Sequence, residues 1–150
     1  MTEFDRVTTE SWTIAFPSDW IDCSEGEDTL YFEAATGEKG FYVSLWQMSE
    51  QELRGSLELV ETFQATELSS FLPKHEAWEL ICRTAEGDEI FAVGFWEGMN
   101  AERKYWICGK QLAAGKYVLR ATYHDYCSDG QEASAHFFSS IIGALQLHAT

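Results

Sequence analysis

Residues 103–123 have the sequence RKYWICGKQLAAGKYVLRATY, and this stretch decides the fold of the chain. Two runs rich in Tyr, Trp, Ile, Val and Leu flank the small residues Ala113-Ala114-Gly115, a pattern that predicts a β-hairpin. Both runs are apolar at adjacent as well as alternate positions, over residues 105–108 and 117–119. Strands of this kind are covered on both faces, so we expect the hairpin to lie at the centre of a layered structure.

The rest of the chain is expected to supply further strands and two amphipathic helices. A long helix is predicted to begin at Ser49, because Ser49 and Glu52 have the spacing of a capping box, and to end near Pro73. Its periodicity places Glu67 on the polar side. A second helix is predicted after Asp129. Strands are predicted at residues 12–16, 29–34, 41–48, 77–83, 89–96 and 97–102.

Consecutive strands joined by short turns pair antiparallel, and a sheet that is apolar on both faces needs cover on both. The sequence therefore predicts an α+β fold, a three-layer α/β/α sandwich. Its central, mostly antiparallel sheet has about six to seven strands, with one long helix on each face. An alternative is a two-layer fold with both helices on one face. That arrangement would expose several of the tryptophans to a ligand or partner: Trp46, Trp78, Trp96 and Trp106.

Two segments resemble the PsbP-like superfamily. The first strand ends in an apolar-Pro-x-x-Trp element, Phe16-Pro17-Ser18-Asp19-Trp20. The final strand ends in a Thr-Tyr-x-x-x-Cys-like element and runs into a helix that carries Ser near its C-terminal part. The residues that match this second element are Thr122, Tyr123, Cys127, Ser139 and Ser140.

The resemblance covers most of the chain and implies a single PsbP-like domain over residues 1–150 with the same α/β/α sandwich. The superfamily includes a photosystem subunit, a nucleotide-release factor for the GTPase Ran, and bacterial Eag-type chaperones of type VI secretion effectors. Its members share binding to another protein without catalysis. The resemblance therefore implies a non-catalytic protein-binding module, with this chain as a bacterial member.

The net charge of −15 is concentrated in the first two thirds of the chain. Residues 103–150 carry five basic and three acidic side chains, a net charge of +2, which leaves −17 for residues 1–102. Such a negative electrostatic field disfavours binding to nucleic acid or to an anionic membrane. It would steer a basic partner toward the first two thirds of the chain. The N-terminus lacks the pattern of a signal peptide, and no apolar run approaches the ~20 residues of a membrane span. We therefore expect a cytoplasmic protein.

Two acidic segments next to aromatic residues are the predicted partner-binding site. If both segments lay at one end of the sheet, they would form an anionic patch for a basic protein. The predicted partner-binding residues are Asp19, Trp20, Asp22, Glu25, Glu27, Asp28, Glu86, Asp88 and Glu89.

The leading hypothesis is a module that holds one partner protein. It could be a chaperone for a secretion effector with apolar helices or an acidic immunity protein that masks a basic toxin. One alternative is an enzyme or a small-ligand or metal-binding protein that uses His124 and Cys127, and another is a subunit or scaffold of a larger assembly. A zinc site usually contains close Cys pairs, and the sequence has no C-x-x-C. We expect no catalytic residue, no metal and no cofactor.

Overall fold

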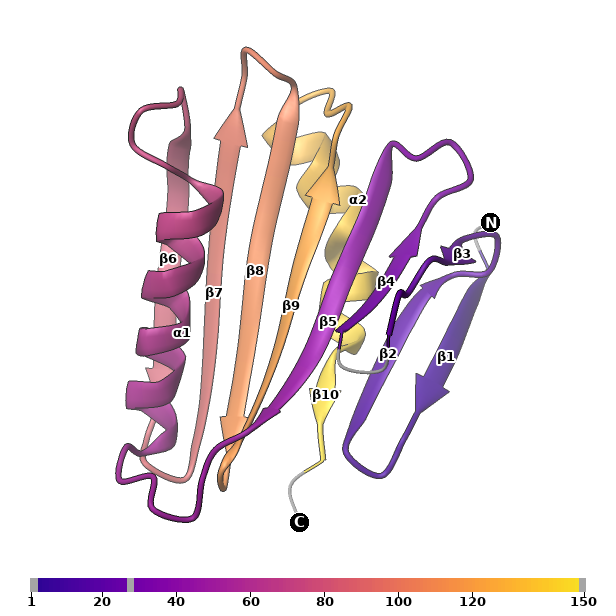
Figure 1. The fold of residues 1–150 in the computed structure, drawn as a ribbon. Coiled ribbons are helices and arrows are strands. Elements are labelled where there is room, and N and C mark those ends of the chain that lie inside the picture. The colour runs from indigo at the N-terminus through magenta and orange to yellow at the C-terminus, as the bar shows by residue number, and fades with distance from the viewer. Residues whose placement is uncertain (1–2, 27–28, 149–150) are drawn as a thin grey trace.

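The computed structural model describes residues 3–26 and 29–148. They form two helices and two antiparallel sheets (Figure 1). The larger sheet has seven strands, and β9 is in the middle. In spatial order these strands are β3 (Ile21–Asp22), β4 (Thr29–Glu33), β5 (Lys39–Gln47), β9 (Tyr117–Asp125), β8 (Tyr105–Ala114), β7 (Phe91–Asn100) and β6 (Glu79–Gly87).

The smaller sheet has three strands and packs on the same side of the larger sheet as the second helix. Its strands are β1 (Phe4–Thr8), β2 (Trp12–Pro17) and β10 (Gln146–Leu147), in the order β1-β2-β10. The helices are α1 (Ser56–Phe71) and α2 (Gln131–Ala144). Among the described residues, no helix is both long and apolar enough to cross a membrane.

The predicted central hairpin is confirmed as β8 and β9, which pair directly from Trp106 opposite Asp125 to Ala114 opposite Tyr117. Almost every residue of both strands is buried, because each face of the hairpin is covered by a different layer. On one face Phe138 of α2 stacks on Trp106, with ring centroids 5.3 Å apart. On the other face, Gln111 donates a hydrogen bond to Glu67 of α1.

The two helices therefore lie on opposite faces of the seven-stranded sheet, as the three-layer prediction requires (Figure 1). Helix α2 and strand β2 enclose the larger core, in which Phe16 stacks on Phe32 with centroids 4.4 Å apart. Helix α1 packs on β6, β7 and β8 and encloses a smaller core around Leu59 and Val60.

Two details of the predicted elements are wrong, and three short strands had no prediction. Helix α1 begins at Ser56, not at Ser49, and Leu53 is 97% exposed. Residues 49–52 form a turn instead, and the Glu52 carboxylate accepts hydrogen bonds from Arg54. The two strands predicted at residues 89–102 are the single strand β7. The strands without a prediction are the N-terminal strand β1, whose five residues are all exposed, and the two-residue strands β3 and β10.

Candidate functional site

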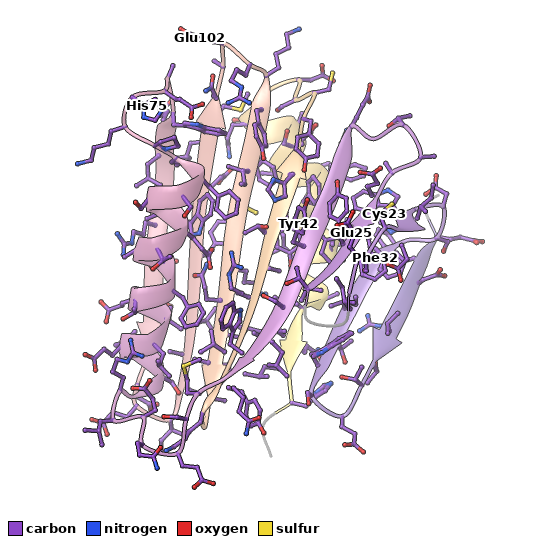
Figure 2. All side chains as sticks on the ribbon, in the orientation of Figure 1. Cys23, Glu25, Phe32, Tyr42, His75 and Glu102 are labelled. Atoms are coloured by element: carbon purple, nitrogen blue, oxygen red, sulfur yellow. The ribbon has the colours of Figure 1, made fainter. Side chains whose placement is uncertain are left out.

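The two acidic segments of the predicted partner-binding site lie apart. Asp22 belongs to β3 at one edge of the seven-stranded sheet, whereas Glu86 belongs to β6 at the opposite edge. Figure 2 shows Glu25 near β3, across the sheet from β6. The segments therefore do not form one patch. Glu27 and Asp28 lie outside the described residues, and a partner-binding role for the exposed acidic residues remains a prediction: Asp19, Asp22, Glu25, Glu86, Asp88 and Glu89.

The segment around Asp88 and Glu89 helps to start helix α1. The Asp88 carboxylate accepts hydrogen bonds from the backbone N–H groups of Ile90 and Phe91, which lower the pKa of Asp88. The backbone carbonyls of Glu89 and Asp88 accept from the N–H groups of Ser56 and Leu57, the first residues of α1. The fold therefore explains the turn, because these carbonyls satisfy N–H groups that a helix leaves unpaired at its N-terminus.

Trp20, the aromatic member of the predicted site, is part of the core. Its side chain is 8% exposed. The ring stacks against Phe137 at 6.3 Å and meets Phe138 edge-on at 6.1 Å, both on α2. Trp20 therefore fixes α2 against the N-terminal segment and offers little surface to a partner.

His124 and Cys127, the alternative site, are not arranged as a thiol and its base. His124 is buried, and its Nδ1 and Nε2 atoms lie 2.6 Å from the Tyr105 hydroxyl and 2.9 Å from the Thr122 hydroxyl. Burial lowers the pKa of His124 to about 3, with a smaller contribution from the positive charge of Arg120. Both ring nitrogens are engaged, so the arrangement offers Cys127 no free base. In the described ranges, no three His, Cys, Asp or Glu side chains are grouped as metal ligands would be.

The α1 side of the sheet is only half covered, and the uncovered half is aromatic. Helix α1 lies over β6, β7 and β8, and no described element lies over β9, β5 and β4 on this side (Figure 1). Tyr42 and Trp46 project there from β5, with 38% and 46% of their surfaces exposed. Tyr31 stacks on Tyr42 at 4.2 Å, and Phe63 of α1 meets Trp46 edge-on at 5.8 Å.

We call this surface the open aromatic face and define it as Tyr31, Tyr42, Trp46, Phe63 and Phe71. Figure 2 shows Tyr42 on β5, on the side of the sheet that carries α1. Sequence patterns pointed to Trp46 only through the two-layer alternative, in which tryptophans were exposed. The exposure has a different origin here, because each face of the sheet carries a helix but α1 is too narrow to cover seven strands.

A groove of about 540 Å³ runs along α1 beside this face. Its lining residues are Trp46, Met48, Arg54, Thr62, Phe63, Thr66, Glu67, Ser70, Phe71 and Arg120. At its base, Arg120 of β9 forms an ion pair with Glu67 of α1, with 2.8 Å between Nε and Oε2. The Glu67 side chain is 3% exposed, so the prediction that Glu67 lies on the polar side of its helix is wrong.

The Glu67 carboxylate is held by three strands at once. Its Oε1 atom accepts hydrogen bonds of 2.9 Å from Trp96 Nε1 on β7 and from Gln111 Nε2 on β8. Its Oε2 atom accepts the hydrogen bond from Arg120 on β9. Helix periodicity could not show this arrangement, because the donors come from strands that follow Glu67 by 29 to 53 residues.

Comparison with solved structures shows two proteins with the same architecture. The cyanobacterial PsbP (CyanoP) of Synechocystis superposes with a TM-score of 0.64 at 12% identity, covering 98% of this chain and 94% of CyanoP. The Ran-binding protein Mog1p of Saccharomyces cerevisiae superposes with a TM-score of 0.55 at 9% identity, covering 99% of this chain and 97% of Mog1p. The chain has the PsbP and Mog1p fold.

The PsbP-like resemblance seen in the sequence is therefore confirmed at the level of fold. Neither a protein-family model nor a curated protein sequence matches the chain. At identities of 9% and 12%, the shared fold does not transfer a site residue by residue, so the candidate site depends on the geometry of this chain.

Proposed function

We propose that the chain is a non-catalytic protein-binding module that holds one partner protein on the open aromatic face. The observation that carries this proposal is the exposure of Tyr42 and Trp46 on a sheet face that no described element other than α1 covers. Contiguous exposed aromatic surface marks interaction sites, and Tyr and Trp are enriched among the residues that dominate binding energy. The Ran-binding function of Mog1p supports a protein-binding role for this fold.

The uncovered area matches one helix of the partner. Neighbouring strands are about 4.8 Å apart, so β9, β5 and β4 together present a width of about 10 Å. That is the diameter of an α-helix with its side chains. The groove follows α1 from Thr62 to Phe71, about 14 Å along the helix axis. An amphipathic helix that lay beside α1 would complete the cover of the sheet, in the manner of helix-in-groove recognition.

This geometry favours the version of the hypothesis in which the partner contributes an apolar helix, as a chaperone client would. The version in which a basic protein binds one acidic patch receives less support, because Asp22 and Glu86 lie at opposite edges of the sheet. The net charge of −15 still favours a partner whose solvent-facing side is basic. No described contact favours the scaffold alternative over a one-partner module.

Two peptide probes test the proposed function. One is an amphipathic helix of Leu and neutral polar residues about 15 residues long, and the other is an Arg-rich peptide of the same length. Amide NMR spectra should show that the amphipathic helix shifts the signals of β5, β9 and α1. This binding should change little with salt, because apolar contacts are not screened. Substitution Trp46→Ala should weaken it about tenfold, as expected for an aromatic anchor.

Substitution Val7→Ala, on the exposed strand β1 of the small sheet, is the matched control and should leave the affinity unchanged. The proposal is wrong if the amphipathic peptide leaves β5 and β9 unaffected. It is also wrong if only the Arg-rich peptide binds and salt removes that binding, a result that would favour the acidic segments instead.

A further inference from the structure

Arg120 has more hydrogen-bond donors than the described residues accept. A guanidinium group carries five N–H donors. Only the Nε donor of Arg120 is used, by Glu67, and neither terminal nitrogen is hydrogen-bonded to a described residue. The side chain is 22% exposed, against 3% for Glu67, so the cation is the outer member of the pair. The unused edge of the guanidinium group is therefore the part that a ligand in the groove can reach.

The buried carboxylate of Glu67 fixes the position of the Arg120 side chain. Glu67 is itself immobilised by Trp96 and Gln111, so the guanidinium group is held by a carboxylate that has little freedom to move. A preorganised arginine loses less conformational entropy on binding than a free surface side chain does. Arg120 is therefore preorganised, and its terminal nitrogens have no hydrogen-bond partner among the described residues.

The surroundings of Arg120 favour an anionic group next to an apolar one. Trp46, Phe63 and Phe71 line the same groove, and apolar walls reduce the screening of a charge contact by water. Arg54 also lines the groove, with Glu52 as its partner. Each of the two arginines in the lining is therefore paired with one glutamate, Arg54 with Glu52 and Arg120 with Glu67, and the attraction of the groove for an anion depends on the unused donors of Arg120.

We propose that the groove recognises a carboxylate on the apolar side of the partner helix, and that the terminal nitrogens of Arg120 bind it. A carboxylate fits the unused fork of the guanidinium group with two parallel hydrogen bonds, and the adjacent apolar side chains of the partner pack on Trp46 and Phe63. This inference rests on the proposed function and names the chemistry that the open aromatic face selects. The acidic residues elsewhere on the chain repel the bound carboxylate only weakly, because charges more than about 8 Å apart are screened at physiological salt.

Two small probes that differ only in charge test the inference. The probes are 3-phenylpropionate and its neutral amide, each titrated into the full chain and followed by amide and indole NMR signals. The acid should shift the signals of Trp46 and Arg120 with a dissociation constant on the order of 1–10 mM. The amide should bind at the same place about tenfold more weakly, because it lacks the charge-assisted hydrogen bonds.

Variants then assign the preference to Arg120. Substitution Arg120→Lys keeps a charge beside Glu67 but removes the planar fork, and it should reduce the preference for the acid several-fold. Substitution Arg6→Lys, on the exposed strand β1, is the matched control and should change nothing. Equal binding of acid and amide overturns the inference, as does an acid preference that survives Arg120→Lys, or the absence of binding by both probes.

The same experiments separate the two proposals. If the amphipathic peptide binds β5 and β9 while the small probes show no acid preference, the proposed function stands and the carboxylate inference is wrong. If neither the peptide nor the probes bind there, both proposals are wrong.

Discussion

Glu67 connects helix α1 to three consecutive strands of the sheet through one carboxylate. A buried carboxylate is tolerated when its lone pairs are filled, and removing it leaves its donors unpaired. Substitution Glu67→Ala should therefore lower the free energy of unfolding by about 2–4 kcal/mol. The loss is not larger because the partly exposed Arg120 regains part of its hydration. Urea denaturation measures this change. Substitution Glu61→Ala, at an exposed position of the same helix, should stay within about 0.5 kcal/mol; equal effects of the two changes would contradict the structural role of Glu67.

The buried His124 side chain makes the free energy of unfolding depend on pH. Burial lowers its pKa to about 3 in the folded chain, whereas the unfolded value is about 6.5. The unfolded state therefore binds more protons between these values, so stability is lost as pH falls through this window. From about pH 7 to about pH 5 the loss due to His124 should be about 2 kcal/mol. Urea denaturation should show a smaller loss over this range in His124→Gln, and an identical loss would contradict the assignment.

At the scale of elements, α1 approaches the sheet closely because β7 carries glycine under it. A Cβ atom at Gly94 would lie 2.5 Å from Val60 Cγ1 and 2.6 Å from Gln64 Nε2, both on α1. Substitution Gly94→Ala should therefore displace the helix and cost about 1–3 kcal/mol in denaturant unfolding. Substitution Gly143→Ala in α2, where a Cβ meets nothing within 4 Å, should be neutral or stabilising. A Gly94→Ala chain as stable as the native one would show that α1 is not seated on this strand.

The elements also show how far the sequence could predict the structure. The hairpin of β8 and β9 was predictable because runs that are apolar on both faces need cover on both. The start of α1 was not, because the N–H groups of Ser56 and Leu57 are satisfied by carbonyls of Asp88 and Glu89, more than thirty residues later. The capping-box letters at Ser49 and Glu52 instead form a local turn.

The candidate site was harder to predict than the fold, because it depends on strand order. Acidic segments that look alike in the sequence lie at opposite edges of the sheet. Glu67 has the spacing of a polar helix position. Its carboxylate is a buried hydrogen-bond acceptor only because β7, β8 and β9 lie beneath the helix and each supplies a donor. The open aromatic face exists because α1 covers β6, β7 and β8 and no described element covers β9, β5 and β4 on that side, a property of the assembled layers rather than of any segment.

On the scale of the whole molecule, the two faces of the sheet are unequal. The α2 side is closed by α2 and β2, whereas the α1 side keeps the open aromatic face exposed. The central claim is that a partner protein covers that face. Site-specific photo-cross-linking from position 42 in the cells that encode the chain tests it most directly, with Val7 of β1 as the control position. The account predicts one discrete protein adduct from position 42, absent from position 7 and reduced by Trp46→Ala; no adduct at position 42, or the same adduct at both positions, would contradict it.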